Sequence, residues 1–120
     1  MALPQVGLFG RDPAPANING VWIANVTYSW GATHKERFSL QADGSRVVGT
    51  ATFLGLPRAA TGMLDGDTLS FAVHGEELLG SDRRQFELTY RGTVVGGGLH
   101  FVLEDSRGNP PVQFAATREP

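Results

Sequence analysis

The chain has 120 residues, the length of one domain, and leaves no room for a second domain of ordinary size. It contains 16 glycines, 7 prolines and no cysteine, so a disulfide-held scaffold is excluded. Its 10 basic and 12 acidic residues give a net charge of -2, which argues against nucleic-acid binding through the phosphate backbone.

The N-terminal segment differs in composition from the rest. Three of the prolines, Pro4, Pro13 and Pro15, lie within it, so we expect a Pro-rich arm over residues 1–19 and a single β-barrel domain over residues 20–118. This segment lacks the basic and long apolar regions of an export signal, and no run approaches the roughly 20 apolar residues of a membrane helix. Together with the absence of cysteine, this favours a soluble cytoplasmic protein without a membrane span.

From Gly20 to Asn109 the chain has one proline, Pro57, so the span can form sheet throughout. Its apolar residues recur at every second position, which is typical of strands with one buried face. The pattern predicts eight strands and no helix. The predicted strands cover residues 21–30, 34–42, 46–54, 61–64, 68–74, 84–91, 99–104 and 112–118, the fourth being the weakest.

The connections between these strands are short and rich in turn residues. Asp43-Gly44 and Asp65-Gly66 supply the positive φ angles of tight hairpin turns, and Gly96-Gly97-Gly98 separates two later strands. Short hairpins in series predict an up-and-down meander that closes into an eight-stranded antiparallel β-barrel. A two-sheet sandwich is the alternative, although its crossings usually need longer connections.

Several short sequence segments follow one another in an order found in a known class of barrels. They are Gly20-Val21-Trp22, the Asp43-Gly44 turn before Val48-Gly49-Thr50, the segment from Gly66 to Phe71, and Tyr90-Arg91-Gly92 followed by Gly97 and Phe101. This arrangement resembles the avidin and lipocalin-like (calycin-type) meander barrels, and the resemblance implies a small ligand held inside the barrel. Ala24, Ala51 and Phe71 stand where avidins have polar or aromatic contacts to biotin, so biotin itself is not expected.

Inward-facing aromatic side chains would converge inside such a barrel and line a site for a small flat or apolar ligand. Tyr28 and Tyr90 would orient this ligand, because a buried phenol needs a hydrogen-bond partner. The alternative is that the aromatic residues fill a solid core. The residues expected to bind the ligand are Trp22, Tyr28, Trp30, Phe53, Phe71, Tyr90 and Phe101.

Other candidate chemistry has a simpler interpretation. We expect His34, His74 and His100 on the surface, so no metal site is predicted, and Asp65 and Asp67 belong to a turn. No nucleotide-binding or nucleophile motif is present, and no cofactor is expected. The charged segment around Glu76, Glu77 and Asp82 is interpreted as a solvated hairpin tip, or as a lip over the barrel mouth.

The sequence is compatible with three functions. The first is a module that binds a small ligand, without catalysis. The second is an interaction or accessory domain with a solid core, in which outward Val21, Ile23, Val48 and Val102 contact a partner or form a homo-oligomer. The third is a cofactor-free enzyme that encloses a substrate for cyclisation or isomerisation.

Overall fold

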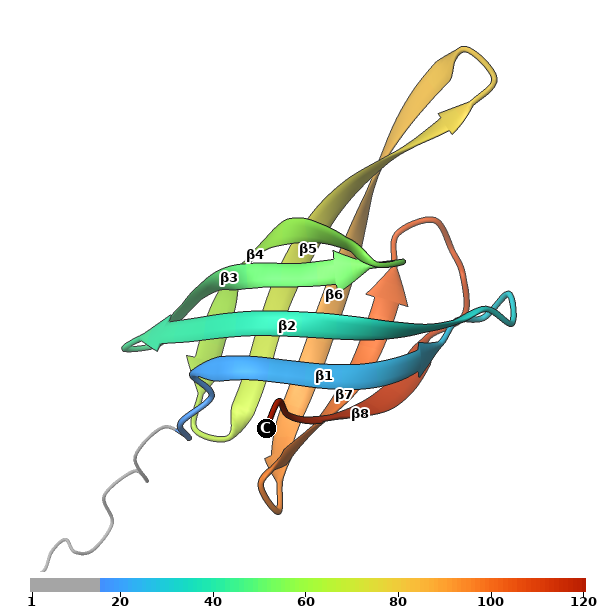
Figure 1. Cartoon of the computed structure of the whole chain (residues 1–120). Coiled ribbons are helices and arrows are strands. Elements are labelled where there is room, and N and C mark those ends of the chain that lie inside the picture. Colours follow the sequence, from blue (N-terminus) through green and yellow to red (C-terminus); the bar gives the residue numbers. More distant parts are fainter. Residues whose placement is uncertain (1–15) are drawn as a thin grey trace, which may run out of the picture.

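The computed structural model describes residues 16–120, which form a closed eight-stranded antiparallel barrel in up-and-down order (Figure 1). Each strand pairs with the next along the chain, and β8 returns to β1. The predicted fold is confirmed, and the described residues contain no helix. Residues 1–15 of the expected N-terminal arm lie outside the described part. The strands are β1 (Gly20–Thr27), β2 (Thr33–Asp43), β3 (Arg46–Phe53), β4 (Leu56–Asp65), β5 (Thr68–Leu79), β6 (Asp82–Val95), β7 (Gly98–Asp105) and β8 (Val112–Arg118).

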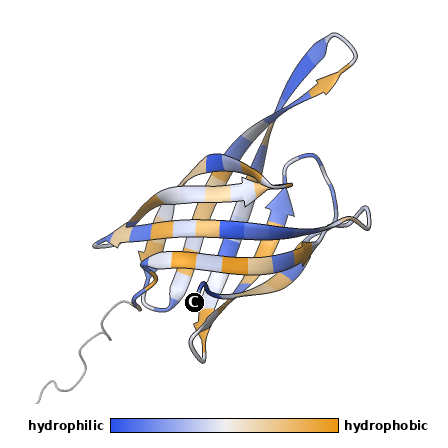
Figure 2. Ribbon diagram, viewed as in Figure 1, coloured by the Kyte–Doolittle hydropathy of each residue, from blue (hydrophilic) through white to orange (hydrophobic). Residues whose placement is uncertain are grey.

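The barrel interior is a packed apolar core. Alternate residues of each strand point inward, and the hydropathy colours alternate accordingly along the strands (Figure 2). Aromatic rings meet at the centre, where Phe71 and Tyr90 stack with ring centroids 4.7 Å apart and Phe38 and Phe101 stack at 5.5 Å. Side chains therefore fill this small barrel, as eight strands commonly allow.

Five consecutive connections are two-residue turns. Gly44, Gly66 and Gly80 occupy the first position of their turns with φ near 65°, which matches the type II′ hairpin turn. The two other turns, at residues 54–55 and 96–97, have positive φ at both positions, as type I′ requires. These turns twist in the same sense as the strands, so they favour the closed meander.

Three strands, β4, β5 and β6, are much longer than predicted. β4 begins at Leu56, because Pro57 pairs with Thr52 of β3, while pairing with β5 starts only at Ala60. A proline is tolerated at such a strand edge, where its missing N–H has no ladder partner.

The charged segment after residue 74 is also strand. His74–Leu79 and Asp82–Glu87 pair only with each other and form a hairpin that projects beyond the barrel (Figure 1). This agrees with the predicted solvated hairpin, whose turn lies at Gly80 and Ser81.

Gly49 and Gly62 lie where neighbouring backbones approach most closely. A Cβ atom at Gly49 would lie 1.9 Å from the carbonyl oxygen of Ser39, and one at Gly62 would lie 1.9 Å from that of Ser70. No side chain fits at such distances. Glycine at these positions allows the strands to bend strongly enough to close the barrel.

Residues 16–19 close one end of the barrel. Ile18 is completely buried, and its carbonyl accepts a hydrogen bond from the indole nitrogen of Trp22 at 2.9 Å. The guanidinium of Arg118 donates to the carbonyls of Asn17 and Asn19 and lies 4.3 Å from the Trp22 ring. These contacts fasten the segment over the end from which β1 starts.

Candidate functional site

The other end of the barrel, here called the loop end, carries the connections β1–β2, β3–β4, β5–β6 and β7–β8. Its central feature is the buried side chain of Glu36, which points inward from β2 in phase with Phe38. The hydroxyl of Tyr28 donates to Oε2 of Glu36, and the hydroxyl of Thr52 donates to Oε1 at 2.7 Å. The carboxyl group is thus held by two hydroxyl donors from neighbouring elements.

Glu36 also holds the β3–β4 turn. The backbone N–H groups of Leu54 and Gly55 donate to Oε2 and Oε1 at 2.8 and 3.0 Å. Leu54 has a φ of 54°, a backbone conformation that is unfavourable for residues other than glycine. The hydrogen bonds to Glu36 stabilise this conformation, so one carboxyl group organises the rim of the loop end.

Three aromatic side chains, those of Tyr28, Trp30 and Phe53, pack together beside Glu36 and are here called the aromatic shelf. The Trp30 ring stacks on Tyr28 with centroids 4.9 Å apart and an interplanar angle of 6°. Phe53 meets the Tyr28 ring edge-on at 5.3 Å. Tyr28 and Phe53 are buried, whereas Trp30 is 48% exposed, so the shelf presents an aromatic surface to solvent.

A polar cluster in the β7–β8 loop faces the shelf. Arg107 donates to both carboxylate oxygens of Asp105 and to Glu77 of the projecting hairpin, and Asn109 donates to Asp105 at 2.9 Å. The Arg107 guanidinium lies 3.9 Å from the centroid of the Phe86 ring. These contacts attach the loop to the base of the hairpin.

The cluster also fixes the ionisation of its members. Burial alone would raise the pKa of Asp105, but hydrogen bonds from Arg107 and Asn109 outweigh it and lower this pKa below its usual value. The hydrogen bond to Asp105 raises the pKa of Arg107. The rim therefore carries a fixed ion pair at neutral pH.

Little empty space separates the shelf from this cluster. The cavity bounded by Tyr28, Trp30, Asp105, Asn109 and Pro110 has a volume of about 10 Å³. That is room for about one water molecule, whereas sites for small ligands usually enclose roughly 300 Å³ or more. A ligand at this end would have to lie on the rim.

The structure divides the seven predicted ligand residues into two groups. Tyr28, Trp30 and Phe53 meet at the loop end. The other four, Trp22, Phe71, Tyr90 and Phe101, are buried in the core. Trp30 was expected to point inward, but β1 ends at Thr27 and the following turn places its ring on the rim.

Sequence reasoning missed the polar members of the site. Glu36 has the inward phase of Phe38 and Leu40, and this phase was the available signal. The contacts of Arg107 depend on three-dimensional proximity of the β7–β8 loop and the hairpin, which no sequence spacing indicates.

The tyrosine hydroxyls should not ionise in the folded protein. Burial raises the pKa of Tyr28, and the hydrogen bond and negative charge of Glu36 raise it further. Burial also raises the pKa of Tyr90, with contributions from Glu36 and Asp105. These are the only 2 tyrosines in the chain, so phenolate absorbance reports on them alone.

We predict that native protein shows no phenolate absorbance as the pH rises through about 10, the ordinary tyrosine pKa, while protein in denaturant titrates there. Above this pH the unfolded chain binds fewer protons than the native state, so the free energy of unfolding should fall as pH rises. An absorbance titration of native protein that resembles the denatured one would contradict the burial of both hydroxyls.

The histidines do not form a metal site. His74 and His100 are exposed, as predicted, and His34 is half-buried. No group of three metal-ligating side chains lies together within residues 16–120. In the same part of the chain there is no helix long and apolar enough to cross a membrane.

Comparisons with protein-family models, curated proteins and solved structures gave no significant match to this chain. Function is therefore inferred from the site geometry.

Proposed function

We propose that this protein is a non-catalytic binding module that holds a small flat, apolar or aromatic ligand on the aromatic shelf of its loop end. The observation that carries the proposal is the position of Trp30, which is 48% exposed and stacked on a buried tyrosine. Exposed aromatic surface has an unfavourable free energy of hydration, and such surface often marks a binding site. A ring that is already oriented loses little entropy when a ligand binds.

The network beneath the shelf supports the same function. Glu36 fixes both Tyr28 and the β3–β4 turn, so the rings that would contact the ligand are held in place before binding. Asp105 and Asn109 lie in the same pocket and supply polar groups at its edge. Because Glu36 has no exposed surface, it is not placed to act on a substrate, which favours binding over catalysis.

The fluorescent hydrocarbon amine 1-aminoanthracene is a suitable probe. We expect it to bind the intact protein and to lose about tenfold in affinity in the Trp30→Ala variant, because aromatic stacking contributes about 1.5 kcal/mol. Met63→Ala is the matched control, since Met63 is an exposed apolar residue outside the shelf. Equal affinity of both variants would overturn the proposal.

Interaction with a partner protein or a second copy is the second candidate function. The filled interior favours it, as do the outward Val48 and Val102, which are 42% and 36% exposed. Sedimentation analysis tests self-association directly. Val48 on β3 and Val102 on β7 lie on opposite sides of the closed barrel, so a symmetric dimer should be weakened by Val48→Ser or by Val102→Ser, but not by both. A protein that stays monomeric at high concentration would exclude the second-copy form.

A further inference from the structure

The barrel is closed by a very short ladder between its first and last strands. β1 pairs with β2 from Gly20 to Thr27, but with β8 only through Trp22–Arg118 and Ile23–Thr117. One additional backbone bond joins the Glu119 nitrogen to the Val21 carbonyl at 2.8 Å. Beyond Ile23, the described part of β1 has no ladder partner in β8. Backbone donors and acceptors along this edge are therefore free for another strand.

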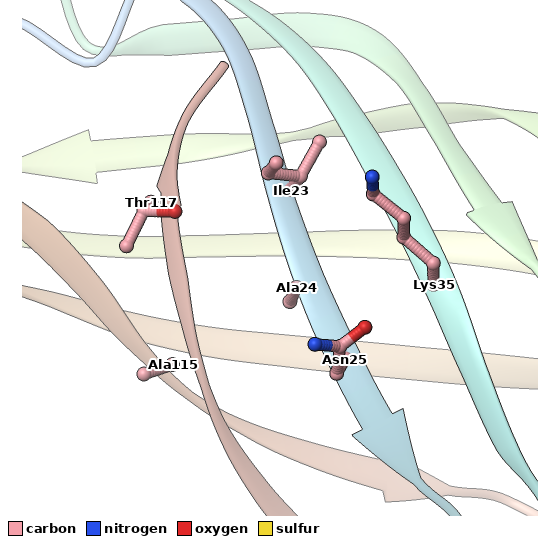
Figure 3. A pocket seen from close by; sticks show the side chains of 6 residues that line it. All are labelled: Ile23, Ala24, Asn25, Lys35, Ala115 and Thr117. Atoms are coloured by element: carbon pink, nitrogen blue, oxygen red, sulfur yellow. The ribbon is translucent and has the colours of Figure 1, made fainter. Parts of the chain in front are cut away.

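A groove lies on the outer surface over the stretch where β1 and β8 run side by side without a ladder. Figure 3 shows this stretch beyond Ile23 and Thr117, with the side chains of Asn25 and Ala115 on either side of the groove. The groove has a volume of about 240 Å³. On the β8 side it is flanked by the short side chains of Ala115 and Thr117. Its lining residues are Ile23, Ala24, Asn25, Lys35, Ala115 and Thr117.

A single basic side chain, that of Lys35, lines the groove. Lys35 lies opposite Asn25 in the β1–β2 register, and Arg37 follows on the same outward face of β2. Glu119 neutralises Arg37 through a 2.9 Å ion pair. Within residues 16–120, no carboxylate forms an ion pair with Lys35. An acidic side chain on a bound segment would complete this arrangement.

We propose that the β1–β8 seam is a strand-addition site for an extended peptide segment of a partner protein. The peptide backbone pairs with the free edge of β1 over Ala24–Thr27, and an Asp or Glu of the peptide faces Lys35. Such binding takes its affinity from backbone hydrogen bonds and its selectivity from side-chain contacts. Strands lie about 4.8 Å apart in a sheet, so the added strand moves the β8 segment Val112–Ala116 farther from β1. The groove shares no lining residue with the pocket of the aromatic shelf, although Val112, the first residue of the displaced segment, lines that pocket.

The test uses three synthetic peptides and a protein variant in which a disulfide can close the β1–β8 seam reversibly. The first probe is an acetylated octapeptide of alternating valine and threonine with one central glutamate. The second carries lysine at this position, and the third carries proline next to it, which removes a backbone donor. Continuation of the ladder register places Asn25 opposite Ala115, so Asn25→Cys with Ala115→Cys gives a disulfide across the seam. The chain has no other cysteine, and the reduced variant is its own control.

We expect the glutamate peptide to shift the backbone amide resonances of Ala24–Thr27 and Val112–Ala116. Affinity should fall about tenfold for the proline peptide, which lacks one backbone hydrogen bond, and about threefold for the lysine peptide. Oxidation of the double-cysteine variant should abolish binding, and reduction should restore it. In Lys35→Glu, which does not require the disulfide, the preference between the glutamate and lysine peptides should reverse. Absence of these resonance shifts at about 1 mM peptide, or binding that survives the disulfide and the charge reversal, would overturn the proposal.

Discussion

Alanine at Gly62 should destabilise the barrel by about 3 kcal/mol or more. The added Cβ would lie 1.9 Å from the carbonyl oxygen of Ser70 and 2.5 Å from the Cα of Phe71. Both are backbone atoms of the paired strand β5, so a change of rotamer cannot relieve the contact. Either β4 separates from β5 or the barrel loses its closure, and chemical denaturation would show the loss as a lower midpoint.

Gly98→Ala is the matched control for this substitution. Gly98 also lies in a strand, and its φ is not positive, but an added Cβ would meet its nearest atom, the carbonyl oxygen of Ala116, at 3.3 Å. A small adjustment accommodates that distance, and we expect a change within about 1 kcal/mol. If Gly62→Ala is no more destabilising than Gly98→Ala, glycine is not what allows β4 and β5 to approach so closely.

Glu36→Gln should cost about 3 kcal/mol of folding stability, although the two side chains have nearly the same shape. Each carboxyl oxygen of Glu36 accepts one hydroxyl and one backbone N–H. An amide replaces one of these oxygens with a donor. The hydroxyl there can rotate to accept, but the backbone N–H of Leu54 or Gly55 loses its partner, whichever way the amide points.

Two tyrosine variants test whether this cost comes from the network. Tyr28→Phe removes a hydrogen bond to Glu36 and should cost about 1.5 kcal/mol. Tyr90 is also a buried residue, but the described residues provide no hydrogen bond to its hydroxyl, so Tyr90→Phe should change stability little. Equal effects of the two variants, or a Glu36→Gln protein as stable as the parent, would show that the network does not stabilise the loop end.

The sequence was sufficient to predict the barrel because its local signals agree. Period-two alternation appears in strand after strand, and glycine occupies the positive-φ positions of the tight turns except at Leu54. The boundaries of β4 to β6 were less predictable. Pairing with β3 alone extends β4 toward its N-terminus as far as Leu56, beyond Pro57. Pairing with each other extends the charged ends of β5 and β6 into a hairpin, although most of these residues are not buried.

The candidate site was predictable only in part. Tyr28 and Phe53 could be placed from strand phase, but phase does not continue through a turn, so the outward position of Trp30 was not foreseen. Glu36 follows the inward phase, yet a lone charged residue is usually exposed unless several donors surround it. Those donors come from the β1–β2 connection, from Thr52 of β3 and from the β3–β4 turn, and only the folded structure brings them together.

The chain's two tryptophans lie at opposite ends of the barrel, and this makes the binding site directly observable. The indole N–H of Trp22 is bonded to the Ile18 carbonyl at the closed end, whereas Trp30 lies on the aromatic shelf. A two-dimensional nitrogen–proton spectrum contains one indole signal for each. On addition of 1-aminoanthracene, the Trp30 signal should shift while that of Trp22 stays in place. A shift of the Trp22 signal, or of neither, would contradict binding on the shelf.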